Sequence, residues 1–413
     1  MGQNGIRMRD NESPQHDVAE IFRKHLDDYK RVHSLSYEQS RAARAIMDCR
    51  TPALGGVLKT CNNGCGHWEF SYKSCKNRHC PKCGSFEKAQ WLERQKVWLL
   101  PISYYHVVFT IDHIFNPLVW WNQTVIYEHL IETASSILKQ YGKKYLGGDI
   151  GFTLVLHTWG QRIQRHPHLH FIVTGGALVT TPNGYSWQMA KRKYLFPVKM
   201  MSQDFLRAFC AGVKKLWLNG NLDTQAGKLD VGKMLETAEN KKWEVYIQPP
   251  LYGPEKLIEY LGRYVFRIAI SNHRILDLKN GQVTFEYYDN LDQGKLKQMS
   301  IPAVEFIGRF LAHVLPSRFV RIRHFGLHHG SCRKKLQQAR RLLDLSMQLP
   351  VPLKLNLLEW LKQVLQTEND PRLCPACHQG ILISGREFGP VSGWREHVLP
   401  LLGVFEQWKF AAL

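Results

Sequence analysis

The segment His168-Leu169-His170 constrains the fold of this chain more than any other. It lies in a run of aromatic and β-branched residues that extends to Thr174, a composition typical of a β-strand. Residues two apart on a strand point to the same face, so both imidazoles would share one face while Leu169 enters the core. Two imidazoles on one face predict a site for one metal ion, and the alternative is a pair of half-exposed side chains without a ligand.

A third ligand for this ion is expected on the preceding strand. His157 lies in the run Phe152 to Thr158, whose composition also predicts a strand. If the two strands form an antiparallel hairpin, His157 would lie opposite the pair formed by His168 and His170. Imidazole nitrogens bind Mn²⁺, and Mg²⁺ is tolerated where phosphate oxygens of a substrate complete the coordination shell. We therefore expect Mg²⁺ or Mn²⁺ at these three histidines.

Two tyrosines further along the chain are candidate nucleophiles. Tyr260 and Tyr264 lie four residues apart in a segment, Pro254 to Ile268, whose pattern predicts a helix, and this spacing puts both phenols on one face. A phenol has a pKa of about 10, so it attacks only when nearby positive charge stabilises its anion. Arg263 and Arg267 could provide that charge or hold a phosphate group. The alternative is that both tyrosines only pack at the edge of the core.

A cluster of cysteines predicts a structural metal site. Five of the ten cysteines lie between Cys61 and Cys83, in short-spaced groups that are followed by turn-forming glycines. Two close thiol pairs separated by about fifteen residues are typical of a tetrahedral Zn²⁺ site, whereas a disulfide framework is typical of small secreted proteins. The predicted zinc ligands are Cys61, Cys65, Cys80 and Cys83.

Further cysteines and histidines leave the zinc chemistry open. Cys75, His67 and His79 could complete a second ion or replace one of the four predicted ligands. Near the end of the chain, Cys374 and Cys377 form another pair with the spacing of half a zinc knuckle. A second zinc site at this pair is the less favoured interpretation, because no second cysteine pair lies near it in the sequence.

A broad excess of positive charge indicates a polyanionic partner. Lys and Arg total 55 against 35 Asp and Glu, which gives a net charge of +20 at pH 7. Neutralising phosphates releases counterions, so nucleic acid is the expected partner. The densest basic stretch begins near residue 318, and within it Arg321 and Arg323 are the predicted DNA contacts. A solvated basic surface would give the same pattern.

The sequence carries no signal for export or for a membrane. The N-terminus lacks the apolar segment of a signal peptide. The longest uncharged run, Val97 to Ile111, is too short to span a bilayer and contains Pro101. We therefore expect a cytoplasmic protein without a membrane partner.

Helical and strand-like patterns alternate along the chain and predict an α+β fold of several units. The dipeptide Asn280-Gly281 between two strand-like runs predicts a hairpin with a type I′ turn. The expected units are a helical segment (1–58), a zinc-binding module with the following helix (59–99), an antiparallel-sheet domain that carries the histidines and the tyrosine helix (100–275), a β-meander with a basic segment (276–330) and a mostly helical C-terminal region (331–413).

Six segments, in consistent order over roughly residues 22–326, resemble the rolling-circle insertion-sequence transposases of the IS91 type, which are HUH endonucleases (U is a hydrophobic residue). These segments are Cys49-Arg-Thr51, Ser74-Cys-Lys-Asn-Arg-His-Cys-Pro-Lys-Cys83, His106-Val-Val-Phe-Thr110, His157-Thr-Trp-Gly-Gln161, His166-Pro-His-Leu-His170 and Tyr260-Leu-Gly-Arg-Tyr264. A match of six ordered segments is more specific than any one motif.

The resemblance implies a zinc-ribbon-like N-terminal region and a ferredoxin-like antiparallel sheet in an HUH nuclease domain. Carried over by position, His168 and His170 hold the divalent metal, and Tyr260 and Tyr264 are the nucleophiles. The implied enzyme nicks and rejoins single-stranded DNA, at element ends and at the target, through a 5′-phosphotyrosine. The resemblance also implies association with bacterial nucleoid DNA. The chain has no Gly-x4-Gly-Lys-Ser/Thr sequence, so strand unwinding is expected from the host replication machinery or a helicase.

Two alternatives stay open at the level of the sequence. A rolling-circle replication initiator of a plasmid or phage would use the same histidine and tyrosine chemistry without moving an element. A non-catalytic, zinc-dependent nucleic-acid-binding protein would use its histidines structurally, and it would form no covalent adduct with DNA.

Overall fold

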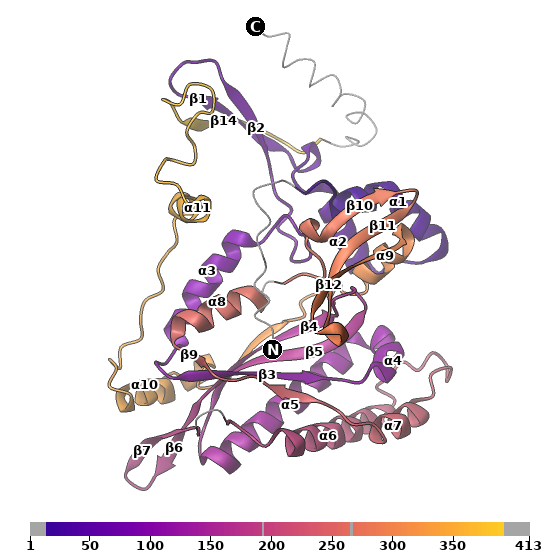
Figure 1. The fold of residues 1–413 in the computed structure, drawn as a ribbon, viewed down its shortest axis with the longest axis vertical. Helices are drawn as coiled ribbons and strands as arrows, with labels where there is room; N and C mark the ends of the chain where they lie inside the picture. The colour runs from indigo at the N-terminus through magenta and orange to yellow at the C-terminus, as the bar shows by residue number, and fades with distance from the viewer. Residues whose placement is uncertain (1–13, 192–193, 265–266, 392–413) are drawn as a thin grey trace. The chain divides into compact units, whose positions relative to one another are not determined.

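The computed structural model describes residues 14–191, 194–264 and 267–391, which form two compact units (Figure 1). Within these residues, the first unit combines 14–87, 270–311 and 355–391, and the second combines 88–269 and 312–354. No helix of the described part of the chain is long and apolar enough to cross a membrane. The fold is mixed α/β with antiparallel sheets, as expected from the sequence, while the ferredoxin-like arrangement stays a prediction.

The centre of the second unit is an antiparallel sheet. Its strands are β3 (Ser103–Thr110), β4 (Gly151–Trp159), β5 (Arg165–Thr174), β8 (Val245–Ile247), β9 (Leu251–Tyr252) and β13 (Ile322–Gly326). The strand order is β13-β4-β5-β3-β8, and β9 also pairs with β3. A separate two-stranded ribbon consists of β6 (Gly176–Thr181) and β7 (Gly184–Met189). The predicted strands that carry the histidines are therefore neighbours in one sheet.

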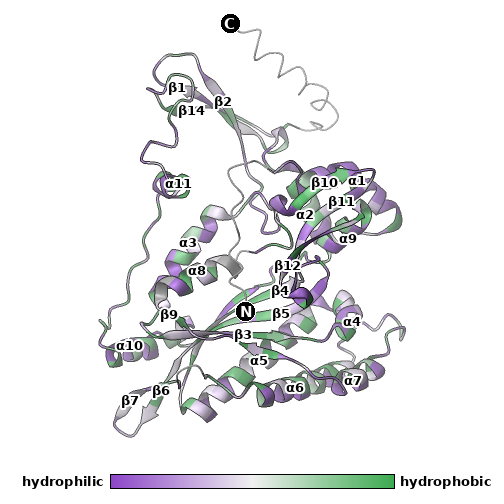
Figure 2. Ribbon diagram, viewed as in Figure 1, coloured by the Kyte–Doolittle hydropathy of each residue, from purple (hydrophilic) through white to green (hydrophobic). Residues whose placement is uncertain are grey.

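Alternating side chains give this sheet two different faces. Figure 2 shows that the central strands β4 and β5 are largely hydrophobic. On one face, Leu169 and Phe171 are fully buried in a core shared with α5, α6 and α7, whereas the other face carries the histidines. There α8 and α10 contribute to a second apolar cluster, in which Leu257 packs with Ile172. The helices of this unit are α4 (Asn116–Trp121), α5 (Gln123–Leu146), α6 (Val198–Leu218), α7 (Val231–Glu239), α8 (Pro254–Tyr264) and α10 (Arg333–Leu342), and α3 (Ser85–Gln95) spans the sequence boundary between the units.

The first unit contains a helical part and two three-stranded antiparallel sheets, with orders β10-β11-β12 and β14-β1-β2. Its helices are α1 (Val18–Val32), α2 (Tyr37–Asp48), α9 (Ala303–Leu311) and α11 (Leu357–Leu365). Its strands are β1 (Gly56–Cys61), β2 (Trp68–Tyr72), β10 (Ile275–Lys279), β11 (Gln282–Asp289), β12 (Lys295–Pro302) and β14 (Leu382–Phe388).

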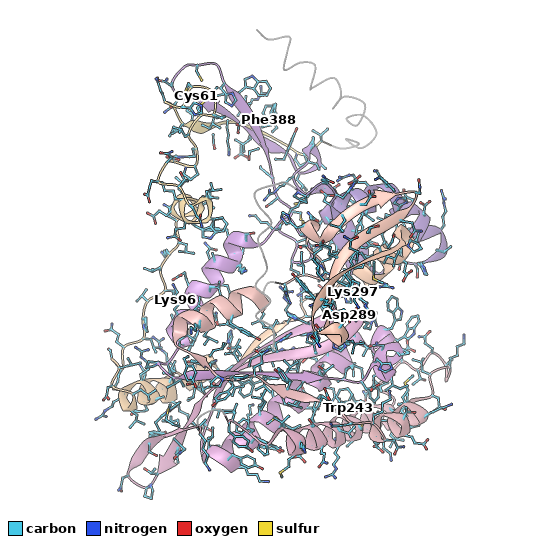
Figure 3. The ribbon with its side chains drawn as sticks, viewed as in Figure 1. Cys61, Lys96, Trp243, Asp289, Lys297 and Phe388 are labelled. Carbon is cyan, nitrogen blue, oxygen red and sulfur yellow. The ribbon has the colours of Figure 1, made fainter. Side chains whose placement is uncertain are left out.

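A helix cap, an aromatic contact and a cross-strand ion pair stabilise elements of this unit. Ser36 starts α2 with a capping box, in which its hydroxyl accepts a hydrogen bond from the backbone N–H of Gln39 while the Gln39 side chain accepts one from the backbone N–H of Ser36. The rings of Phe22 on α1 and Phe310 on α9 meet edge to face, 5.4 Å apart. Asp289 at the end of β11 and Lys297 on β12 form an ion pair of 3.0 Å (Figure 3). These three kinds of interaction all stabilise the observed helices and strands.

The hairpin predicted at Asn280-Gly281 is confirmed. These residues have φ angles of 51° and 72°, and they connect β10 with β11. A type I′ turn needs positive φ at both central residues, which asparagine and glycine adopt at low cost.

Two of the predicted units contain strands that pair with distant parts of the chain. Within the predicted unit 276–330, β10 to β12 belong to the first unit, but β13 pairs with β4 in the sheet of the second. The predicted mostly helical region 331–413 contains β14, which pairs with β1. Strand pairing between segments so far apart in the sequence is not encoded in a local pattern.

Candidate functional site

Strands β4 and β5 bring three histidines together on one face of the sheet. In their antiparallel register His157 lies directly opposite His168. The ring centroids of His157 and His170 are 4.5 Å apart, and those of His168 and His170 are 4.7 Å apart. Each ring offers one nitrogen, and the three nitrogens lie within 4.8 Å of one another. The structure therefore brings together all three residues that the sequence predicts as metal ligands.

Burial keeps the imidazoles of His168 and His170 neutral, which is the form that binds metal ions. Nδ1 of His168 lies 2.7 Å from the carbonyl oxygen of His166, which places the proton on Nδ1 and leaves the lone pair on Nε2. Burial, together with the neighbouring His166, lowers the pKa of His168 to about 3. Burial and then His157 lower the pKa of His170 well below its usual value. Three neutral nitrogen donors fit Mn²⁺ and leave coordination positions for phosphate oxygens.

A fourth histidine, His106 on β3, supports this cluster and is not among the predicted ligands. Its Nε2 lies 2.8 Å from Nδ1 of His170, and the two rings are stacked with centroids 5.0 Å apart. Burial lowers the pKa of His106 to about 4, although a hydrogen bond with the Gln248 side chain opposes this shift. A hydrogen bond of this kind fixes the orientation of a metal-binding imidazole. The alternation of the strand puts His106 on one face, but only the pairing of β3 with β5 brings it to His170.

Replacing His106 by phenylalanine is expected to weaken Mn²⁺ binding by about 10- to 100-fold, because the ring of His170 loses its orienting hydrogen bond. The matched variant His106→Gln keeps a polar group at this position and should weaken binding less. Electron paramagnetic resonance of free Mn²⁺ during a titration measures both affinities. If His106→Phe folds normally and binds Mn²⁺ like the wild type, the hydrogen bond does not position His170.

Helix α8 places Tyr260 beside the histidines. Leu257, on the same helix, is fully buried in the apolar cluster on this face of the sheet. The ring centroid of Tyr260 lies 4.9 Å from that of His106. Tyr264 ends α8, and the side chains of Arg263 and Tyr264 lie outside the described residues. One of the two predicted nucleophiles therefore contacts His106, which in turn contacts the predicted ligand His170.

The other predicted DNA contacts differ in their surroundings. The positive charge of Arg267 is one of the smaller causes that lower the pKa of His168, which places this arginine within electrostatic reach of the cluster. Arg321 donates a hydrogen bond from Nη1 to the carbonyl oxygen of Arg267 at 3.4 Å. Arg323 instead forms a two-pronged ion pair with Glu128, with Nη1 2.7 Å from Oε2. This carboxylate holds the guanidinium in place, and the DNA contact predicted for Arg323 stays a prediction.

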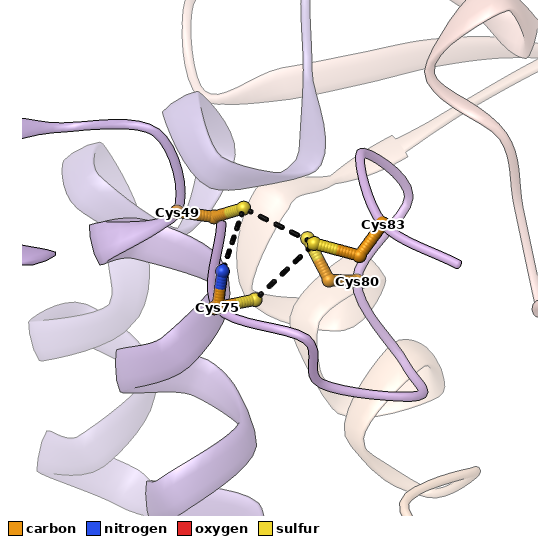
Figure 4. Close-up of side chains that lie close together, drawn as sticks. All are labelled: Cys49, Cys75, Cys80 and Cys83. Carbon is orange, nitrogen blue, oxygen red and sulfur yellow. Dashed lines mark hydrogen bonds between the residues drawn. The ribbon is translucent and has the colours of Figure 1, made fainter. Parts of the chain in front are cut away.

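A first quartet of cysteines converges in the first unit, as Figure 4 shows. It consists of Cys49, Cys75, Cys80 and Cys83, whose sulfur atoms lie within 4.8 Å of one another. Cys49 follows the last residue of α2, and the other three lie on the loop after β2. Hydrogen bonds from Cys49 and then from Cys75 lower the pKa of the Cys83 thiol, so a thiolate is favoured there. Four sulfur donors at these distances fit a tetrahedral Zn²⁺ site.

The four zinc ligands predicted from the sequence do not form one site. Cys80 and Cys83 belong to the first quartet, whereas Cys61 and Cys65 lie in a second quartet with Cys374 and Cys377. The reason is the length of β1, which has six residues and thus spans about 20 Å at about 3.3 Å per residue. It carries Cys61 and Cys65 to the far end of the β1–β2 hairpin, away from the loop that follows β2.

Two known protein families match this chain, one over the region of the first cysteine quartet and one over the region of the histidine cluster. Residues 21–111 match the family described as "Transposase zinc-binding domain", and residues 151–335 match the family described as "Putative transposase". The first match contains the whole first quartet, and the second contains the three clustered histidines and both tyrosines. No solved structure matches the chain significantly.

Two curated relatives resemble this chain over most of its length. The "Putative transposase y4qJ" of Sinorhizobium fredii is 38% identical over 389 residues, which is 91% of this chain and 96% of the relative. The transposase for insertion sequence element IS801 of Pseudomonas savastanoi pv. phaseolicola is 27% identical over 339 residues, 80% of each chain. These matches define the chain as a zinc-binding DNA transposase. It belongs to the IS91-type family of insertion-sequence transposases, and the resemblance seen in the sequence is confirmed.

Proposed function

We propose that this transposase nicks and rejoins single-stranded DNA through a 5′-phosphotyrosine, with Tyr260 as a nucleophile and with His157, His168 and His170 as ligands of a divalent ion. One observation carries the proposal: three histidine nitrogens within 4.8 Å of one another lie on the sheet face to which Tyr260 packs through His106. A bound Mg²⁺ or Mn²⁺ would polarise a phosphate oxygen of the DNA as a Lewis acid.

The tyrosine chemistry balances without an outside energy source. Oη of Tyr260 attacks the phosphorus in line and gives up its proton, while the bond from phosphorus to the 3′ oxygen breaks and the departing 3′ oxygen takes up a proton. One phosphodiester replaces another, so the free energy of the bond is kept in the tyrosyl link and rejoining needs no ATP. Tyr264, one helical turn further along α8, is the proposed second nucleophile, which would hold a second strand.

The surrounding residues have proposed roles in binding DNA. Arg267 and Arg321 neutralise phosphates next to the scissile bond, and His106 orients the imidazole of His170. The net charge of +20 favours DNA along a wider surface. The proposed substrates are single strands at the element ends and at the target, opened by the host replication machinery or a helicase. The first cysteine quartet holds a Zn²⁺ ion that has a structural role.

The test is a search for the covalent intermediate. The full chain is incubated with Mn²⁺ and single-stranded oligonucleotides that carry element ends, labelled at either end, and products are separated under denaturing conditions. A 5′-phosphotyrosine predicts that the 3′ label migrates with the protein, while the 5′ label appears on a short fragment. The double variant Tyr260→Phe/Tyr264→Phe should lose the adduct completely.

The matched control is Tyr252→Phe, an exposed tyrosine on β9 of the same sheet, which should form the adduct like the wild type. An adduct that persists in the double variant would reject both tyrosines as nucleophiles. Absence of any adduct with the wild-type chain would favour the non-catalytic nucleic-acid-binding alternative. A replication initiator would also form the adduct, but the zinc-binding and transposase families that this chain matches favour transposition.

A further inference from the structure

The second cysteine quartet is built from opposite ends of the sequence. Cys61 is the last residue of β1, and Cys65 lies in the turn that leads to β2. Cys374 and Cys377 precede β14, which pairs with β1 so that Cys61 lies opposite Leu382. Two short turns, each with two cysteines, thus meet at one end of the sheet β14-β1-β2. Figure 3 labels Cys61 at this end and Phe388, the last residue of β14, toward the other.

The sulfur positions match a tetrahedral metal site. Sγ of Cys61 lies 3.7 Å from Sγ of Cys377, and Sγ of Cys65 lies 3.7 Å from Sγ of Cys374. A regular tetrahedron with Zn–S bonds of about 2.3 Å has edges of about 3.8 Å between sulfur atoms. A disulfide would need sulfur atoms about 2.05 Å apart, and all four residues are free thiols. The spacing is therefore that of four thiolates around one ion.

Backbone N–H groups donate hydrogen bonds to two of the four sulfur atoms. The N–H of Asn63 donates to Sγ of Cys61 at 3.4 Å, and the N–H of Gly380 donates to Sγ of Cys377 at 3.4 Å. Donors of this kind form the outer shell of metal–thiolate sites, where they stabilise the ligand charge.

Gly380 shows how closely the two turns approach. A Cβ atom at this position would lie 2.6 Å from Sγ of Cys61 and 2.6 Å from Cβ of Asn63, so any larger residue would push the sulfur away. The turns are also joined by two hydrogen bonds between Asn62 and Ile381: the N–H of Asn62 donates to the Ile381 carbonyl oxygen at 3.1 Å, and the N–H of Ile381 donates to Oδ1 of Asn62 at 2.8 Å. Contacts outside the four sulfur atoms therefore hold the two turns together.

We propose that Cys61, Cys65, Cys374 and Cys377 hold a second structural Zn²⁺ ion, which closes a zinc ribbon from β1, β2 and β14. The matched zinc-binding region ends at residue 111 and the matched transposase region ends at residue 335, so half of this site lies outside both. The ion would bind the segment 373–388 to the N-terminal hairpin. This inference concerns the fold and does not depend on the proposed strand-cleaving chemistry.

The test is the zinc content of the full chain, purified without added metal and measured by mass spectrometry under native conditions and by atomic emission. The wild type should hold two zinc ions, and Cys374→Ser/Cys377→Ser should hold one. Cys61→Ser/Cys65→Ser should also hold one. The variant with all four substitutions should still hold one, because both pairs bind the same ion. This pattern is specific to a site shared by both pairs. Cys332→Ser, outside both quartets, is the matched control and should keep two ions.

Two results would overturn the proposal: one zinc ion in the wild type, or two in Cys374→Ser/Cys377→Ser. Iron in place of zinc at the second quartet would also reject it, and the same emission measurement detects iron. If the serine variants fold poorly, replacement of zinc by Co²⁺ in the intact wild type decides the question. Two Co²⁺ ions should then bind per chain, each in a tetrahedral thiolate site. Saturation after one equivalent of Co²⁺ would contradict the second site.

Discussion

Replacing His168 and His170 together by alanine is expected to lower the rate of single-strand cleavage by about 10³-fold or more. Stabilisation of charge on a phosphate by a bound ion is worth several kcal/mol, and about 4 kcal/mol corresponds to a factor of about 10³. Leu169 and Phe171, whose side chains enter the core on the opposite face, stay in place, so the sheet should fold normally. The measurement is the initial rate of cleavage of a labelled oligonucleotide as a function of Mn²⁺ concentration.

The matched control is His113→Ala, which removes an exposed histidine from the same unit and should leave the rate unchanged. Excess Mn²⁺ should not restore the double variant, since two of three ligands are missing. Wild-type rates in the double variant would reject the histidine cluster as the metal site. In that case an adduct at Tyr260 would still stand, so the two assignments can fail separately.

Replacing Cys80 by serine is expected to remove the zinc ion of the first quartet and to release the loop after β2. Cys80 is almost fully buried, at 1% exposed, and structural zinc sites contribute about 10–16 kcal/mol of apparent binding free energy in small zinc-dependent domains. The loop contains the trypsin sites Lys73, Lys76, Arg78 and Lys82. Cleavage at these sites should become at least about tenfold faster, which corresponds to a loss of at least about 1.4 kcal/mol of local stability.

Limited trypsin digestion followed by peptide mass analysis measures this release, and zinc content measured on the same samples gives the loss of one ion. Cys332→Ser should digest like the wild type. Treatment of the wild type with a strong chelator should reproduce the pattern of the Cys80 variant. Unchanged protection of the loop in a variant that has lost its zinc would show that packing, rather than the ion, holds the loop.

Much of the local structure follows from patterns within short windows of the sequence. The alternation around His168 and His170 predicts β5, and the composition of 152–158 predicts β4, because side chains on a strand point to alternate faces. The turn residues Asn280 and Gly281 predict the β10–β11 hairpin. The position of His157 opposite His168 follows from the simplest connection of two adjacent strands.

Residues that depend on distant pairing could not be assigned in this way. His106 reaches His170 only because β3 pairs with β5, and no local pattern states which strands become neighbours. Nearness in the sequence groups Cys61 and Cys65 with Cys80 and Cys83 as zinc ligands. The folded chain regroups them, because a strand separates the two sets and a C-terminal strand brings Cys374 and Cys377 to Cys61.

The sequence by itself determined the family of this protein, the residue types of its chemistry and the faces on which its histidines lie. These properties depend on residue identity and on periodicity, which are local. The tertiary structure alone decided which thiols lie together, which histidine supports His170 and that Arg323 is paired with Glu128. Those pairings depend on which distant segments become neighbours, and that is set by burial and strand pairing across the whole chain.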